Sequence, residues 1–106
     1  MKRTVVVRYQ VHPAAAEENQ RLVEDVYAEL AAEDPGGLRY ATYRLADGVT
    51  FVHVATLDGE ANPLDATVAF ARFQEGLAER CAHLPVASGA TIVGAYGTGR
   101  GESGAG

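Results

Sequence analysis

The residues that most constrain the fold are Gly36 to Leu57, which read GGLRYATYRLADGVTFVHVATL. Two runs rich in β-forming residues, Leu38 to Leu45 and Val49 to Leu57, flank the tripeptide Ala46-Asp47-Gly48. Asp-Gly between two such runs is a strong signal for a hairpin, because glycine adopts positive φ angles without strain. The sequence therefore predicts a β-hairpin in the middle of the chain.

The segments before the hairpin have the patterns of a strand and a long helix. Thr4 to Val11 alternates, with Val5, Val7, Tyr9 and Val11 on one face, which predicts a strand. From Ala14 to about Glu33, apolar residues recur with helical spacing between acidic ones. Asp34-Pro35-Gly36-Gly37 then predicts the end of this helix and the turn into the hairpin.

The segments after the hairpin predict a second helix and a last strand. Asn62 is a suitable N-cap and Pro63 a suitable first residue for a short helical turn. A firmer helix is expected over Val68 to Cys81, where Phe70, Phe73, Leu77 and Cys81 share a face. His83-Leu84-Pro85 is expected to end it, and Ala90 to Tyr96 to form the last strand. Residues 98–106 are rich in glycine and are expected to be a disordered tail.

This order of elements predicts an α+β fold of the ferredoxin-like βαββαβ type, as one domain over residues 1–97. The right-handed crossover rule and the hairpin together give an antiparallel sheet of strand order 4-1-3-2, with two helices on one face. The first and third strands lie in the middle and carry apolar side chains on both faces. Two helices cover only one face, so we expect a homodimer in which the other sheet faces pack together.

Composition excludes several classes of partner. The 106 residues carry nine Lys and Arg against fourteen Asp and Glu, a net charge of −5, which argues against nucleic acid and anionic membranes. No apolar run approaches the roughly 20 residues of a membrane span, and no signal peptide is expected. The single cysteine, Cys81, fits a reducing compartment, so we expect a cytoplasmic protein. No metal-ligand spacing and no flavin, nicotinamide or phosphate motif is visible, so no cofactor is expected.

The stretch GGLRYATYRL, the hairpin, FVHVATL and NPLDATVAFARFQEGLAERC resemble the antibiotic biosynthesis monooxygenase-like family of dimeric α+β barrels. The shared features are a glycine before the second strand, Tyr-x-x-Tyr-Arg within it, a Phe-Val start to the third strand and an aromatic pair early in the last helix. The resemblance covers about Thr4 to Tyr96. It implies the fold, a dimer, and an activity such as oxygenation of aromatic compounds without metal or flavin.

The chain departs from the family at polar positions. The third strand of the family commonly ends in Glu-x-Trp, where this chain has Ala55 and Leu57. The chain has no Trp, and its two Asn residues, Asn19 and Asn62, fall in a helix and at a cap. The resemblance therefore does not extend to the haem-degrading members of the family.

His53 is the candidate catalytic residue, because it places a titratable imidazole in the middle of a central, apolar strand. In an apolar cavity it would act as a general base toward a phenolic proton, or anchor a substrate. The alternative is a buried or interfacial histidine that is satisfied by a hydrogen bond.

Aromatic residues are the candidate binding groups for a flat ligand. The candidates are Tyr9, Phe51, Tyr40, Phe70 and Phe73. Tyr40 and Tyr43 have opposite parity on their strand, so they cannot both face one cavity. For each aromatic residue the alternative is a place in the core.

Three arginines, Arg8, Arg39 and Arg44, are candidates for binding a carboxylate or a phenolate. The alternatives are an ordinary ion pair at the strand edge and a position at the dimer rim.

These observations lead to a small homodimeric protein that binds a small hydrophobic or aromatic molecule. The resemblance implies a cofactor-independent monooxygenase, in which the deprotonated substrate reacts directly with O2. A non-catalytic binding or interaction protein of the same fold is the first alternative, and an isomerase or cyclase that uses a histidine is the second.

Overall fold

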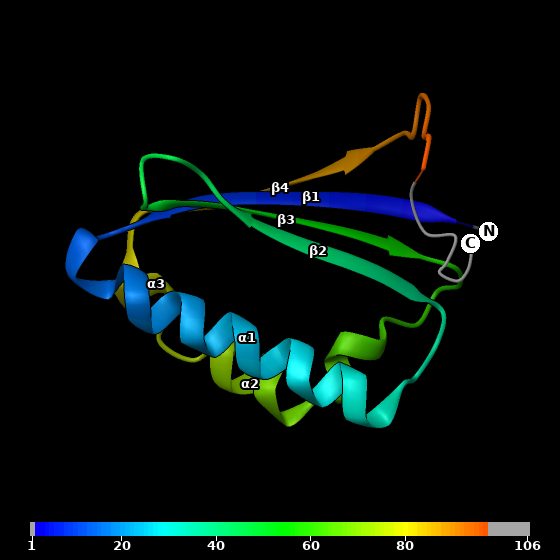
Figure 1. Ribbon diagram of the computed structural model, residues 1–106, viewed down its shortest axis with the longest axis horizontal. Coiled ribbons are helices and arrows are strands. Elements are labelled where there is room, and N and C mark those ends of the chain that lie inside the picture. Colours follow the sequence, from blue (N-terminus) through cyan, green and yellow to red (C-terminus); the bar gives the residue numbers. More distant parts are fainter. Residues whose placement is uncertain (1, 98–106) are drawn as a thin grey trace.

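The computed structural model describes residues 2–97, which form one four-stranded antiparallel sheet with helices on one side (Figure 1). The strands are β1 (Arg3–Val11), β2 (Leu38–Arg44), β3 (Thr50–Leu57) and β4 (Cys81–Ala90). The helices are α1 (Ala16–Glu33), α2 (Val68–Gln74) and α3 (Leu77–Arg80), with short 3-10 turns η1 (Pro13–Ala15) and η2 (Pro63–Ala66). The expected tail, residues 98–106, lies outside the described residues.

The strand order is β2-β3-β1-β4, which is the predicted order read from the opposite edge. The antiparallel sheet and the helices on one face confirm the ferredoxin-like α+β fold. β1 and β3 occupy the centre of the sheet. Because side chains alternate between the two faces of a strand, one set of their side chains points toward the helices. Tyr9, Phe51 and Phe73 belong to the core that fills the space between the two layers.

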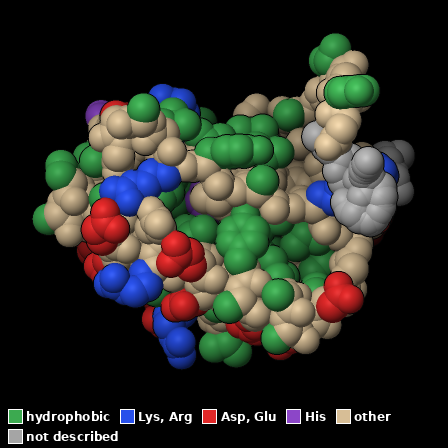
Figure 2. All heavy atoms as spheres, viewed as in Figure 1, with side chains coloured by type: hydrophobic (Ala, Val, Ile, Leu, Met, Phe, Trp, Pro, Cys, Tyr) green, Lys and Arg blue, Asp and Glu red, His purple; other side chains and the backbone are tan. Residues whose placement is uncertain are grey.

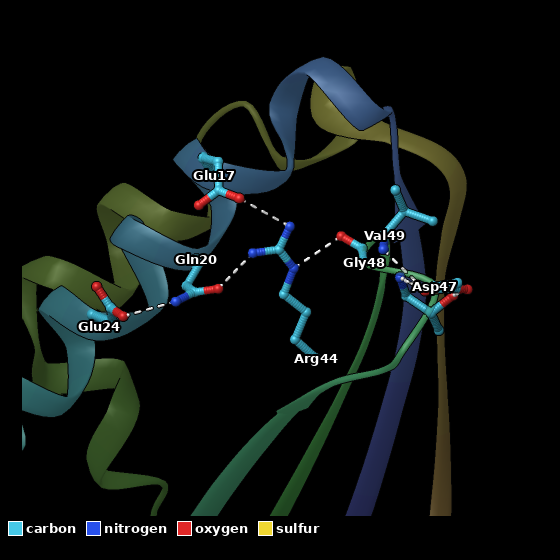
Figure 3. Close-up of polar contacts among 8 residues, drawn as sticks. Glu17, Gln20, Glu24, Arg44, Asp47, Gly48 and Val49 are labelled. Atoms are coloured by element: carbon cyan, nitrogen blue, oxygen red, sulfur yellow. Dashed lines mark hydrogen bonds and ion pairs between the residues drawn. The ribbon is translucent and has the colours of Figure 1, made fainter.

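The predicted hairpin is confirmed, and its turn is also tied to α1. Gly48 has φ 79°, and the Asp47 carboxylate accepts the backbone N–H groups of Val49 and Thr50, each at 2.9 Å. Arg44, at the end of β2, donates to the Gly48 carbonyl and reaches α1, where it pairs with Glu17 at 3.1 Å (Figure 3). Arg44 thus forms the ordinary ion pair at a strand edge.

The C-terminal third differs from the prediction in two places. The helix expected over Val68 to Cys81 is interrupted at Glu75 and Gly76, because Gly76 has φ 75° and the chain leaves the helical region there. The last strand is Cys81–Ala90, so the expectation of a last strand over Ala90 to Tyr96 is wrong. His83-Leu84-Pro85, expected to end the helix, lies within this strand.

A bulge explains how proline fits into β4. Arg8 pairs with Val86 and Gln10 with His83, so Leu84 and Pro85 together lie opposite the single residue between them on β1. β4 is an edge strand, and a proline at a bulge of an edge strand removes no essential ladder hydrogen bond.

The sheet face opposite the helices has no covering element among residues 2–97. Val6 of β1 pairs with Val54 of β3, which pairs in turn with Ala41 of β2, so these side chains share that face. Val52 lies on the same face, and all four residues are half-buried. An apolar strip therefore runs across the centre of the uncovered face.

Candidate active site

A cavity of about 350 Å³ lies between the sheet and the helices. Its wall is largely apolar and includes Val5, Val7, Leu64, Phe70 and Leu77. Figure 2 shows hydrophobic side chains gathered in the band between the two layers, with charged side chains mainly toward the left of that view. The volume is at the lower end of the roughly 300–1,000 Å³ that is typical of ligand pockets, so the cavity suits a small ligand.

Three adjacent strands bring His53 and two tyrosines together in the cavity wall. On β3, His53 is directly opposite Val7 of β1 and Thr42 of β2. Tyr9 and Tyr40 are each two residues from these positions, so they are diagonal neighbours of His53 on the same face of the sheet. Tyr9, Tyr40 and His53 all line the cavity.

Both ring nitrogens of His53 have hydrogen-bond partners. The Tyr9 hydroxyl lies 2.8 Å from Nε2, and the Tyr40 hydroxyl lies 2.6 Å from Nδ1. The Thr42 hydroxyl is also 3.2 Å from Nδ1. The His53 side chain is 5% exposed and is therefore buried, and its ring nitrogens are satisfied by these hydrogen bonds. His53 nevertheless forms part of the cavity wall.

Burial sets the protonation states of this cluster. Desolvation lowers the pKa of His53 from its ordinary value of 6.5 to about 4. Burial also raises the pKa of the Tyr9 and Tyr40 hydroxyls above their ordinary value. At neutral pH the imidazole and both phenols are therefore uncharged, and the cluster presents neutral donors and acceptors in an apolar wall.

The other predicted aromatic residues divide between the cavity and the core. Phe70 and Phe73 line the cavity, and their ring centroids are 6.0 Å apart. Phe73 also lies against His53, with ring centroids 5.5 Å apart. Phe51 is outside the cavity lining: it is 2% exposed and stacks on Tyr9 with centroids 5.7 Å apart. Tyr43 is 55% exposed, whereas Tyr40 lines the cavity, so the two tyrosines do not face the same cavity, as their opposite parity predicts.

Two polar residues of the site were missed in the sequence. Asn19 of α1 is fully buried and donates to the Tyr9 hydroxyl at 2.9 Å. Arg80 of α3 is 7% exposed and donates from Nε to Asn19 Oδ1 at 3.0 Å. Asn19 has helical spacing from Val23 and Val26, which predicts that it lies on the apolar face of α1. This spacing was the sequence signal that could have identified Asn19.

Arg80 also joins the three helices. Its Nη2 donates to the Phe73 carbonyl at 2.7 Å and its Nη1 to the Glu75 carbonyl at 3.2 Å, at the C-terminal end of α2. A cation at that end of a helix is favourable, and the guanidinium also lies 5.4 Å from the Phe73 ring centroid. Within the described part of the chain, Arg80 makes no ion pair.

No metal site or membrane helix is found in the described residues. Among residues 2–97, no group of three or more His, Cys, Asp or Glu side chains is placed to hold a metal ion. None of the helices there combines the length and hydropathy that a membrane-spanning helix requires.

The fold is shared with solved structures of antibiotic biosynthesis monooxygenase-like proteins. A Caulobacter crescentus protein provisionally assigned as an antibiotic biosynthesis monooxygenase is 25% identical, with a TM-score of 0.69 over 88% of this chain and 91% of that one. A Bacteroides thetaiotaomicron protein with the same provisional assignment is 17% identical, with a TM-score of 0.75 over 87% of this chain and 90% of that one.

A third similar structure is a variant of SnoaB, a cofactor-independent oxygenase from Streptomyces nogalater. It is 20% identical, with a TM-score of 0.66 over 91% of this chain and 97% of that one. No family model and no curated protein matches the sequence. The family resemblance seen in the sequence is therefore confirmed at the level of the fold.

Proposed function

We propose that the protein binds a small aromatic molecule in the cavity and oxygenates it without metal or flavin. The observation that carries the proposal is an apolar cavity of about 350 Å³ whose wall holds the hydrogen-bonded cluster Tyr9, His53 and Tyr40. The flat rings of Phe70 and Phe73 suit an aromatic ligand. Similarity of fold to a cofactor-independent oxygenase agrees with the proposal.

The proposed chemistry needs only the substrate and O2. Transfer of a proton to water from a phenol or from an adjacent activated carbon gives an electron-rich anion that reacts with O2 at carbon. Cleavage of the O–O bond leaves one oxygen atom on that carbon as a carbonyl and releases the other as water, and the substrate carbon supplies all the electrons. We propose that His53 is the residue on which this chemistry depends, within the hydrogen-bonded cluster.

The proposal includes a homodimer and a cytoplasmic location. The apolar strip of Ala41, Val6, Val52 and Val54 supports dimerisation through the uncovered sheet face, because such strips are normally buried against another surface. The lone cysteine of the sequence supports the location.

Oxygen uptake with a panel of phenols and quinols tests the activity. We expect uptake with at least one class of compound and its loss in His53→Gln. Ala55→Phe is a second variant, because Ala55 lines the cavity and a phenyl ring there would fill it while His53 stays intact. Absence of both binding and uptake across the panel would contradict the proposal.

A non-catalytic binding protein is the second candidate. The observation that favours it is that both nitrogens of His53 already have hydrogen-bond partners. Saturable binding of aromatic compounds that Ala55→Phe abolishes, without oxygen uptake by the wild-type protein, would establish this alternative.

A further inference from the structure

A chain of polar side chains runs through the core from α3 to the cavity. Arg80 Nε contacts Asn19 Oδ1 at 3.0 Å, and Asn19 Nδ2 contacts the Tyr9 hydroxyl at 2.9 Å. The Tyr9 hydroxyl contacts His53 Nε2 at 2.8 Å, and His53 Nδ1 contacts the Tyr40 hydroxyl at 2.6 Å. Each link is within hydrogen-bond distance, so the direction of every donor matters.

Arg80 fixes the direction of the first three links. A guanidinium only donates hydrogen bonds, so the Asn19 atom beside it must be the carbonyl oxygen. The amide nitrogen of Asn19 therefore faces Tyr9 and donates to the phenol oxygen. Among the described residues, His53 Nε2 is the remaining hydrogen-bond partner of the Tyr9 hydroxyl, so Tyr9 donates its hydrogen to Nε2.

The same logic fixes the tautomer of His53. Because Nε2 accepts from Tyr9, the neutral ring carries its hydrogen on Nδ1 and donates it to the Tyr40 oxygen. The hydrogen of the Tyr40 hydroxyl is then left for another acceptor. The Thr42 hydroxyl lies 3.2 Å from Nδ1 and 2.9 Å from the Tyr27 hydroxyl. A ligand oxygen in the cavity would supply the acceptor for the Tyr40 hydrogen. Tyr40 is half-buried, whereas the other four members of the chain are buried.

We infer that Arg80 and Asn19 are positioning residues that hold His53 in its Nδ1–H form and thereby make the Tyr40 hydroxyl a hydrogen-bond donor to the ligand. The ligand class follows from the donor role of Tyr40. It is an aromatic molecule with a carbonyl or phenolate oxygen that accepts a hydrogen bond. This ligand half of the inference rests on the proposed function. A donor at this place also stabilises an oxyanion of the substrate.

The direction of the hydrogen bonds along the chain also assigns His53 a role other than general base. A second proton on the ring would have to sit on Nε2, and the Tyr9 hydrogen would then lose its acceptor. An unsatisfied buried hydroxyl is costly, so protonation of His53 is opposed by the chain itself. Of the two roles expected from the sequence, the structure favours the anchoring of the substrate, which His53 performs through the Tyr40 hydroxyl that it orients.

The 15N resonances of the His53 ring test the tautomer directly. We expect Nδ1 in the range of a protonated nitrogen and Nε2 in the range of an unprotonated one. Asn19→Asp keeps the shape of the side chain but replaces its donor by a second acceptor, so Tyr9 would turn toward Asp and accept from Nε2–H. The tautomer should therefore reverse in this variant.

Gln20→Glu makes the same chemical change on the neighbouring residue of α1 and should leave the tautomer unchanged. A wild-type ring with hydrogen on Nε2 would overturn the inference, and this measurement needs no variant. An unchanged tautomer in folded Asn19→Asp would also overturn the role of Asn19.

Binding of 1-tetralone and its parent hydrocarbon tetralin, measured by calorimetry, tests the ligand half. Loss of one hydrogen bond in Tyr40→Phe should weaken 1-tetralone binding roughly 3- to 10-fold and change tetralin binding less than about twofold. Equal effects on both probes would overturn the donor role while leaving aromatic binding intact. Failure of both probes to bind would overturn the ligand half. The panel of phenols and quinols would still decide the proposed function, and the 15N result would still decide the tautomer.

Discussion

His53 is the residue through which pH should act on stability. Its pKa is about 4 in the folded protein and ordinarily 6.5, so between these values the unfolded chain binds a proton that the folded protein does not. The free energy of unfolding should therefore fall as the pH falls from 6.5, by up to about 3 kcal/mol, and this group should contribute no further loss below about pH 4.

Urea unfolding of wild type and His53→Gln between pH 7 and 4.5 measures this effect. The variant should show a flatter decline of unfolding free energy over that window, whatever its stability at pH 7. Parallel declines in the two proteins would show that His53 does not cause the pH dependence.

Tyr9 stabilises the fold through its hydroxyl as well as its ring. Tyr9→Phe would leave Asn19 Nδ2 and His53 Nε2 without their partner in a buried site. We expect the free energy of unfolding to fall by about 1–3 kcal/mol in chemical denaturation. Tyr43→Phe makes the same change on an exposed ring and should stay within about 0.5 kcal/mol of wild type. Similar losses in the two variants would contradict the importance of the buried chain.

The sequence predicted only part of the candidate site, for a physical reason. His53, Tyr9 and Tyr40 were candidates, and they share one face of three neighbouring strands. The sequence left open which face of the sheet His53 occupies, because the central strands are apolar on both faces. Arg80 contacts Asn19 across 61 positions of sequence, and this contact depends on the break in the helix before α3. Strand and helix periodicity carry no information about such a break.

At the scale of elements, the break between α2 and α3 is set by Gly76. Its φ of 75° belongs to the left-handed region, where a side chain is unfavourable. Gly76→Ala should therefore lower the free energy of unfolding by about 1–2 kcal/mol in urea denaturation. Gly59→Ala is the control, because no atom lies within 4 Å of the added Cβ and its φ is outside the left-handed region. A neutral Gly76→Ala would mean that the break has another cause.

The elements that the sequence predicted well are those with unambiguous local signals. Asp47-Gly48 marked the hairpin, and Asn62 caps η2 by accepting the Leu64 N–H at 3.0 Å. The last strand was misplaced because Pro85 was interpreted as a breaker, whereas a bulge against β1 accommodates it. A bulge depends on the partner strand, so the sequence of β4 alone does not reveal it.

For the whole molecule, the proposed dimer makes a specific prediction about the uncovered sheet face. Val54 lies on central strand β3, on the apolar strip that no described element covers. Val54→Lys would place a charge in the proposed interface, and burying an unpaired charge opposes association strongly. We expect wild type to have the mass of two 11.2 kDa chains in light scattering, and the variant to be monomeric.

Val68→Lys is the matched control, because Val68 is 63% exposed at the start of α2, in the helix layer on the other side of the sheet. This variant should remain dimeric, and circular dichroism should show that both variants are folded. A monomeric wild-type protein would refute the dimer, and dimers in both variants would place the interface elsewhere. Because the cavity lies on the helix side of the sheet, a folded Val54→Lys monomer should still bind 1-tetralone, which separates the assembly of the protein from the chemistry of its site.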